Sequence, residues 1–429
     1  MNEPSAPSPR FKQVRLVNRI FYRVMTTLLR GVIVRYFQLD SINSQVVPER
    51  GAGIILANHA TLFDPIWVYV LLRRPVYFAA TEDLFRQRAL GRLIGWFGAF
   101  PKRKAASDIS ALRSMFSVAG RGGLIGVFPE GVRSWDGTVQ PIFPGIAKLI
   151  RKMEIPVSVC RLEGAYFVFP RWARRWRRFP VKAVFSRLYR PEEIPHEDER
   201  IIQDIQQALQ GSSTCTAVDA SRFAYKGLAV DLTHVLYRCP SCGTLEGLKV
   251  VRPFSANRVE CSSCFSSWVI DVTCRLSPAD EEGRPEGVWT NLSQHYARIK
   301  AMPFTPIRSE ARLGLSPGEQ VYLISRPHFL FMQEKFPNLR VFAFGRAFLT
   351  NRRLLFRTRL GIPLAAPLAA LGALSVDPGD KLHFTFEGRL YRIPFRHESA
   401  LKWFDSIHRL QETMRGVREP AAVHQDAAV

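Results

Sequence analysis

The sequence contains no long, uninterrupted apolar run. Its longest uncharged stretch, residues 360–376, is broken by two prolines and two glycines. A bilayer-spanning helix needs roughly 20 strongly apolar residues, so the sequence predicts no transmembrane helix. The first residues, MNEPSAPSPRFKQ, also lack the apolar core and small-residue cleavage site of a signal peptide.

Acidic residues are scarce relative to basic ones. The chain has 60 Lys and Arg against 37 Asp and Glu, which gives a net charge of +23 and a pI near 10.2. This imbalance indicates an anionic partner, and the two candidates are nucleic acid and the anionic face of a bilayer. The composition, 47% apolar and 23% charged, is that of a globular protein. A length of 429 residues predicts two or three domains.

The seven cysteines do not form the dense pattern of a secreted disulfide framework. Three stand alone in the sequence: Cys160, Cys215 and Cys274. The other four, Cys239, Cys242, Cys261 and Cys264, follow the pattern C-x2-C-x18-C-x2-C, which is similar to that of zinc ribbons. Four thiolates close a tetrahedral site, so we expect a structural zinc ion in a small module over residues 236–275.

Residues 1–45 contain a candidate amphipathic helix. Five basic residues recur at helical spacing along one side: Lys12, Arg15, Arg19, Arg23 and Arg30. The other faces are largely apolar, a combination typical of a helix that lies in the headgroup region of a membrane. A helix packed on the next domain, with its arginines in water, would give the same pattern, but the overall charge favours the membrane surface.

From about residue 46 to residue 211, short apolar runs alternate with helical stretches, which predicts an α/β domain. Buried strands are expected at residues 54–57, 124–128 and 157–160. Helices are expected at residues 65–72, 145–153 and 197–209.

The strongest local signal is the segment NHATLFD, residues 58–64, directly after the first predicted strand. A histidine can take a proton from a hydroxyl at neutral pH, and a carboxylate on its other ring nitrogen would fix its tautomer. Residues five apart do not face each other on a helix, so His59 and Asp64 can pair only across a turn. The Asp64-Pro65 pair supports such a turn, because Asp suits an N-cap and Pro the first helical position. A loop histidine beside a capping aspartate would show the same local pattern.

Three further blocks follow in order: GAFPKRK at residues 98–104, FPEGVRS at 128–134 and IPVSV at 155–159. With the NHxxxxD block they make residues 35–210 resemble the glycerolipid acyltransferase family, which includes the 1-acylglycerol-3-phosphate acyltransferases. Two positions depart from the family pattern. Val132 replaces the usual Thr, and the stretch 141–145 lacks the family's frequent lysine.

The resemblance implies an O-acyltransferase in which His59 is the general base and Asp64 orients it. The implied substrate-binding residues are Arg103 for the acceptor phosphate, Glu130 and Gly131 for the glycerol backbone, Arg133 and Ser134 for further phosphate contacts, and Pro156 for the acyl-donor region. The donor would be acyl-CoA or acyl-carrier protein, and the acceptor a lysophosphatidate-type lysophospholipid. The hydroxyl would attack the thioester directly, without an acyl-enzyme.

The rest of the chain carries weaker signals. Residues 171–178 mix tryptophan with arginine, which favours a bilayer interface, although the same mixture could stack on single-stranded nucleic acid. A connector is expected at 212–235 and a polar loop at 276–290. Residues 300–415 are typical of strands followed by a closing helix, and residues 344–356 resemble a strand pair of PH and GRAM domains. The last residues, 416–429, are expected to be a disordered tail.

The sequence therefore predicts a glycerolipid-acyltransferase-type α/β domain, followed by a small zinc ribbon and a β-rich PH/GRAM-like domain. We expect membrane lipids and an acyl donor as partners, with no nucleic acid. The expected location is the cytoplasmic face of the cell membrane, as a peripheral or monotopic protein. Two other classes fit part of the sequence: a nucleic-acid-binding zinc-ribbon protein and a non-catalytic lipid-binding scaffold.

Overall fold

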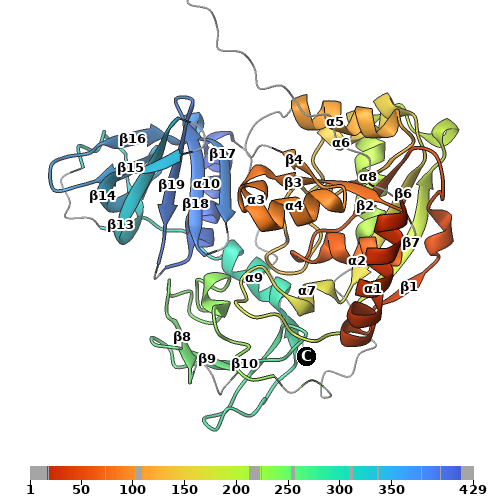
Figure 1. Ribbon diagram of the computed structural model, residues 1–429. Helices are drawn as coiled ribbons and strands as arrows, with labels where there is room; N and C mark the ends of the chain where they lie inside the picture. The colour runs from red at the N-terminus through yellow and green to blue at the C-terminus, as the bar shows by residue number, and fades with distance from the viewer. Residues whose placement is uncertain are drawn as a thin grey trace, which may run out of the picture. The chain divides into compact units, whose positions relative to one another are not determined.

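The structure is a computed structural model that describes residues 17, 19–72, 74–102, 109–211, 223, 225–252, 257–308, 313–335, 338–377, 379–396 and 398–416. Several sites named above lie outside these residues: Lys12, Arg15, Arg103, Cys215 and all but the first residue of the predicted tail. The chain divides into two compact units (Figure 1). Unit 1 comprises Met1–Arg171 and Arg175–Phe223, and unit 2 comprises Trp172–Arg174 and Ala224–Val429.

Unit 1 is an α/β domain around a seven-stranded sheet in the order β1-β7-β6-β2-β5-β3-β4. Its strands are β1 (Asp40–Ile42), β2 (Gly53–Ala57), β3 (Val76–Thr81), β4 (Phe100–Lys102), β5 (Leu124–Val127), β6 (Val157–Glu163) and β7 (Lys182–Tyr189). Neighbouring strands are parallel except for the antiparallel pair β6 and β7. The three strands predicted from apolar runs are the central strands β2, β5 and β6.

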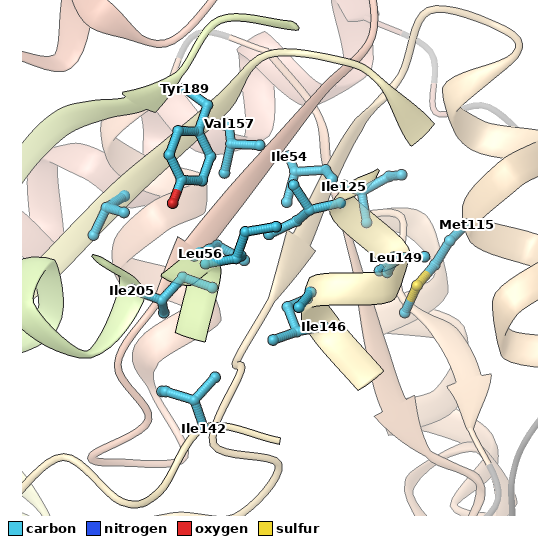
Figure 2. Packing of buried hydrophobic residues seen from close by; sticks show 14 of the residues in the cluster. Ile54, Leu56, Met115, Ile125, Ile142, Ile146, Leu149, Val157, Tyr189 and Ile205 are labelled. Atoms are coloured by element: carbon cyan, nitrogen blue, oxygen red, sulfur yellow. The ribbon is translucent and has the colours of Figure 1, made fainter. Parts of the chain in front are cut away.

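The helices of unit 1 are α1 (Arg19–Phe37), α2 (Asp64–Leu71), α3 (Glu82–Arg86), α4 (Arg88–Trp96), α5 (Ile109–Ala119), α6 (Gly145–Met153), α7 (Ala165–Val168) and α8 (Asp198–Leu209). Figure 2 shows Leu56 of β2 packed in one cluster with Ile146 of α6 and Ile205 of α8. Each such side chain, once buried, stabilises the fold by about 1.5–3 kcal/mol. The central strands β2 and β5 are apolar throughout because both faces of a parallel sheet are covered, whereas β6 also carries Ser158, Arg161 and Glu163.

The opposite face of the sheet carries α2. The ring of Tyr69 on α2 packs edge-to-face on Phe78 of β3, with ring centroids 5.6 Å apart. Tyr22 of α1 donates a hydrogen bond from its hydroxyl to the Tyr69 carbonyl at 3.0 Å, which ties α1 to α2. The predicted helix over residues 1–45 is therefore α1, and the chain after it already enters the sheet as β1.

Unit 2 begins with a five-stranded antiparallel sheet in the order β12-β11-β10-β9-β8. The strands are β8 (Leu248–Val251), β9 (Arg258–Cys261), β10 (Ser267–Ile270), β11 (Arg275–Pro278) and β12 (Thr290–Asn291), followed by α9 (Leu292–Ala301). The prediction of a loop over 276–290 is wrong at both ends, because β11 pairs with β10 and β12. Leu276 and Ser277 are buried there, and Ser277 is a polar residue that composition assigns to a loop.

The remainder of unit 2 is a seven-stranded sheet in the order β16-β15-β14-β13-β19-β18-β17. Its strands are β13 (Val321–Lys335), β14 (Asn338–Thr350), β15 (Arg353–Arg357), β16 (Leu364–Pro367), β17 (Gly372–Asp377), β18 (Lys381–Phe386) and β19 (Arg389–Pro394). All the pairs are antiparallel. The closing helix, α10 (Ala400–Met414), begins after Ser399, whose side chain accepts a hydrogen bond from the Lys402 main chain. Trp403 of α10 stacks on Phe395, with ring centroids 5.2 Å apart.

Candidate active site

The loop between β2 and α2 carries the predicted histidine and aspartate, and the structure brings their side chains together. His59 Nδ1 lies 2.9 Å from Asp64 Oδ2. The same carboxylate oxygen accepts hydrogen bonds from the main-chain N–H groups of Ala60 and Thr61 at 2.7 and 2.8 Å. Residues 59–64 therefore form the turn that the pairing of His59 with Asp64 requires. Helix α2 starts at Asp64 itself, with Phe63 at the N-cap, one residue earlier than expected.

Asn58 fixes this loop to the sheet, a role that the sequence analysis missed. Its side-chain amide donates to the Leu162 carbonyl at 3.2 Å and accepts from the Leu162 N–H at 2.7 Å. Leu162 belongs to β6, the neighbour of β2. Because both groups of the buried amide are used, Asn58 anchors the residue next to His59 on a rigid strand.

Glu130 lies against the same loop, but its carboxylate contacts main chain. Oε1 accepts a hydrogen bond from the N–H of His59 at 2.7 Å, and Oε2 accepts one from the N–H of Gln140 at 2.8 Å. Burial raises the pKa of Glu130 to about 8, against the lowering effect of these two hydrogen bonds. Glu130 thus joins the loop of His59 to the loop after β5, and its contact with a glycerol backbone stays a prediction.

Ser134 and Gly131 also shape the loop after β5. Ser134 is buried, its N–H donates to the His59 carbonyl at 2.9 Å, and its hydroxyl accepts from the N–H of Gly137. Gly131 has a φ of 69°, in the left-handed region that glycine tolerates best, and closes a tight turn with Phe128. The Ser134 hydroxyl therefore forms hydrogen bonds within its own loop, and its contact with a phosphate stays a prediction.

The surroundings of the His59 imidazole favour its neutral form, which can accept a proton. Burial lowers the pKa of His59, Asp64 opposes this, and the positive charges of Arg133 and Arg171 lower it further. At neutral pH the ring is neutral, with the Nδ1 proton directed to Asp64 and the Nε2 lone pair available. About 21% of the His59 side chain is exposed, at a shallow depression that Asn58 and Glu130 also line. This arrangement suits proton abstraction from a hydroxyl that approaches the exposed part of the ring.

Two cations accompany the histidine. Arg171 donates from Nη1 to the Arg133 carbonyl at 2.8 Å, and its guanidinium lies 4.3 Å from the ring centroid of Trp135. The segment after Arg171 is irregular chain in which Arg177 is buried and Trp176 is 59% exposed. The predicted phosphate ligand, Arg103, lies outside the described residues, so Arg133 and Arg171 are the described cations that act on His59.

Pro156, which is predicted to shape the acyl-donor region, lies away from the His59–Asp64 pair. It immediately precedes β6, and β6 runs parallel to β2 with Ile54 opposite Val157. The start of β6 is therefore at the opposite end of the sheet from His59, roughly 20 Å away at 3.3 Å per residue. Pro156 lines a separate pocket there with Ser158 and Arg187.

The four paired cysteines converge in unit 2. All four Sγ atoms lie within 4.8 Å of one another, and the pairs Cys239–Cys264 and Cys242–Cys261 are each 3.7 Å apart. A tetrahedral zinc ion with bonds of about 2.3 Å separates its sulfur ligands by about 3.8 Å. Hydrogen bonds with Ser266 lower the pKa of Cys264 to about 6, whereas burial raises the pKa of Cys239 to about 12. The donor set therefore fits zinc, and four thiolates would leave no open position.

Comparison with known proteins shows that the α/β part of unit 1 is similar to acyltransferases. Residues 38–163 match the family model named Acyltransferase. The chain is 22% identical over 156 residues to the chloroplastic 1-acyl-sn-glycerol-3-phosphate acyltransferase BAT2 of Brassica napus, over 35% of this chain and 45% of that protein. It is 19% identical over 144 residues to the 1-acyl-sn-glycerol-3-phosphate acyltransferase of Bacillus subtilis (strain 168), over 33% of this chain and 71% of that protein.

A solved structure is also similar. The crystal structure of the 1-acyl-sn-glycerophosphate acyltransferase PlsC from Thermotoga maritima aligns with 20% identity and a TM-score of 0.42. The alignment covers 47% of this chain and 82% of that one. The chain thus spans less than half the length of the Brassica napus relative. The family-model match at residues 38–163 includes both His59 and Asp64.

Proposed function

We propose that this chain, which carries an acyltransferase domain at residues 38–163, transfers a fatty acyl group from a thioester donor to the free hydroxyl of a lysophosphatidate-type lysophospholipid. The observation that carries the proposal is the contact of 2.9 Å between His59 Nδ1 and Asp64 Oδ2. It leaves the second ring nitrogen as a base on a partly exposed side chain. The names of the two relatives support the acceptor class.

In the proposed reaction, His59 Nε2 takes the proton of the acceptor hydroxyl as the oxygen attacks the thioester carbonyl carbon. A carbon–oxygen bond forms, the carbon–sulfur bond breaks, and the proton passes from the imidazolium to the departing thiolate. Asp64 holds the tautomer and stabilises the imidazolium during this step. The products are an ester and a free thiol, and the chain forms no covalent intermediate.

Positive charge near the histidine suits an acceptor that bears a phosphate. Arg133 and Arg171 influence His59 electrostatically. A guanidinium keeps its charge at all physiological pH values and matches phosphate geometry. Arg133 thus remains a proposed phosphate contact, as does Arg103, which lies outside the described residues.

We assign the chain to an anionic membrane surface, with α1 as the element that inserts. Ile20, Val24, Leu28 and Val32 recur every fourth residue along α1 and are 75%, 53%, 65% and 70% exposed. Such a row does not contribute to the core, and a soluble surface rarely keeps it. The exposed side chains of Arg23, Arg30 and Arg35 on α1 would contact lipid phosphates, at about 1 kcal/mol each. In the described part of the chain, no helix has the length and apolarity needed to cross a bilayer.

Unit 2 is proposed to serve this enzyme as an accessory region. The four cysteines would hold one structural zinc ion in a ribbon that continues through β11 and β12. The seven-stranded antiparallel sheet with α10 is proposed to be a PH/GRAM-like domain. Zinc would supply only structural stability, because it would have no free coordination position.

The test is an acyl-transfer assay with the full chain. Purified protein would be incubated with radiolabelled acyl-CoA or acyl-carrier protein and a panel of lysophospholipids in vesicles. We expect a labelled phospholipid product with lysophosphatidate or a close relative, and loss of that product in His59→Ala. Absence of product with every acceptor and both donors, in protein that is folded and bound to vesicles, would refute the proposal.

A further inference from the structure

Three nearly parallel rings form a stack that ends at the imidazole of His59. The imidazole lies on Phe128, with ring centroids 4.1 Å apart and planes 14° apart. Phe128 in turn lies on Phe78, with centroids 5.0 Å apart and planes 17° apart. Phe78 is 2% exposed and is braced by Tyr69 of α2. We call His59, Phe128 and Phe78 the ring stack.

Gly126 makes room for the ring stack. It is the β5 residue opposite Phe78 of β3. A Cβ atom at this position would lie 2.4–2.6 Å from three atoms of the Phe78 ring, closer than such contacts occur. The alternation of side chains along β5 places Phe128, two residues later, on the same side of the sheet. Gly126 therefore leaves the space in which the ring of Phe78 stacks on the ring of Phe128.

From this geometry we infer that Phe128, supported by Phe78, is a positioning residue that fixes the plane of the His59 imidazole. The inference rests on the proposed role of His59 as general base. Phe128 does not itself exchange a proton or touch the reacting atoms. It is part of the FPEG segment, whose Glu130 already holds the His59 main chain.

The ring stack supplies a restraint that the other contacts of His59 lack. The hydrogen bond to Asp64 fixes one atom of the imidazole, Nδ1, and still permits the ring to tilt about it. A flat aromatic surface at 4.1 Å restricts that tilt and keeps Nε2 directed at one point. Errors of about 1 Å in the placement of a reacting group cost roughly 100-fold in rate, so this restraint affects turnover.

Phe128 also removes water from one face of the imidazole. The charged groups that act on His59 are Asp64 from α2 and the two arginines, Arg133 and Arg171, while Glu130 contacts its main chain. A substitution at Phe128 leaves all four side chains in place. A change in the protonation of His59 in such a variant would therefore report the loss of the ring itself.

The test compares Phe128→Leu with Phe128→Tyr in the full chain. We expect Phe128→Leu to lower kcat about tenfold with KM changed less than about twofold, because positioning and not binding is lost. Phe128→Tyr keeps the ring and should retain most of the activity. A second readout needs no turnover: the rate at which diethyl pyrocarbonate modifies His59, followed by mass spectrometry as a function of pH. The midpoint should rise in Phe128→Leu, toward the ordinary histidine value, because water then reaches the ring.

Two further variants separate positioning from simple loss of stability. Gly126→Ala should lower kcat and move the His59 midpoint in the same direction as Phe128→Leu, since its methyl group displaces Phe78. Phe185→Leu, at a fully buried ring on β7, should lower the unfolding temperature yet leave kcat and the midpoint unchanged. If folded Phe128→Leu keeps the wild-type kcat and the wild-type midpoint, the inference is wrong. If the wild-type chain transfers no acyl group, the proposed function fails, while the midpoint still tests the ring stack.

Discussion

Glu130 Oε1 accepts a hydrogen bond from the main-chain N–H of His59 at 2.7 Å, although the two residues are 71 positions apart. The acidic residue of the third sequence block thus holds the backbone of the histidine in the first block. Its other oxygen binds the N–H of Gln140, so both oxygens are used inside the protein. The first and third sequence blocks therefore meet in one cluster of loops, at the ends of β2 and β5.

Removing either member of the catalytic pair should abolish most of the activity. We expect His59→Ala and Asp64→Asn each to lower kcat by about 10³–10⁴-fold, because the base, or its tautomer and orientation, is lost. Acyl transfer in vesicles measures this effect. Asp198→Asn, a partly exposed carboxylate paired with Arg151, is the matched control and should keep full activity. Equal rates for Asp64→Asn and the wild-type chain would contradict a role for this pair.

The pH dependence of kcat/KM should reflect the lowered pKa of His59. Protonation of Nε2 removes the base, so activity falls as pH drops through that pKa. Burial and the two arginines lower the pKa of His59 from its usual 6.5, and the acid limb should therefore have its midpoint below pH 6.5. Arg133→Gln removes one of these cations and should move the midpoint to higher pH. A midpoint above 6.5 in the wild-type chain would contradict the neutral, buried imidazole.

The exposed row on α1 should control binding to vesicles. Burial of a leucine in an apolar phase is worth about 1.5–3 kcal/mol, so Leu28→Ser should weaken partition by roughly tenfold or more. Co-sedimentation with vesicles containing anionic lipid measures this partition. Val288→Ser, at an 81% exposed position in unit 2, is the control and should bind like the wild type. Unchanged partition of an Ile20/Leu28/Val32 triple serine variant would rule out α1 as the inserting element.

The cysteine cluster should contain one zinc ion per chain. Metal analysis of purified protein is expected to give that ratio, and Cys242→Ser should lose the metal, because its thiolate is one of four ligands. Loss of the ion should also lower the unfolding temperature, since metal binding contributes to folding free energy. Cys274→Ser, at a buried cysteine outside the cluster, should keep the metal. Metal-free wild-type protein with an unchanged unfolding temperature would contradict the assignment.

A buried carboxylate should make unit 2 sensitive to acid. Burial would raise the pKa of Glu398, but hydrogen bonds from His328, Lys402 and Trp403, together with the charge of Lys402, lower it to about 2. A carboxylate with a lowered pKa stabilises the fold above its unfolded pKa of about 4.5 and loses that effect as pH falls toward 2.

Glu398→Gln should therefore cost roughly 3 kcal/mol of unfolding free energy at pH 7, with a difference from wild type that shrinks below about pH 4.5. Hydrogen exchange of residues 400–414, compared between the variant and the wild type at each pH, measures this difference in unfolding free energy. Glu412→Gln, an exposed position on the same helix, should have little effect. A constant difference between pH 7 and pH 3 would contradict the linkage.

Local sequence patterns were sufficient to predict the helices and strands whose buried residues are mainly apolar. The central strands β2 and β5 were predicted because a strand covered on both faces is apolar throughout. The start of β6 was predicted from Val157, Val159 and Cys160. Helix α6 was predicted at Gly145–Met153, its bounds in the structure, because its apolar residues recur at helical spacing. The strand β11 was not, since a short strand with polar residues has no such signal. The partners of Asn58 and Phe128 were likewise hidden, because Leu162 and Phe78 lie far away in sequence.

The sequence by itself determined the residue types and their order: a histidine and an aspartate that can pair only across a turn, and four cysteines at ligand spacing. Those conclusions depend on local chain geometry, because the number of residues between two side chains limits how they can meet. Only the tertiary structure decided which distant groups act on them. Parallel pairing of β2 and β6 brought Leu162 to Asn58 and sent Pro156 to the far end of the sheet. Strand register is a property of the packed sheet, and one sequence read along its length does not contain it.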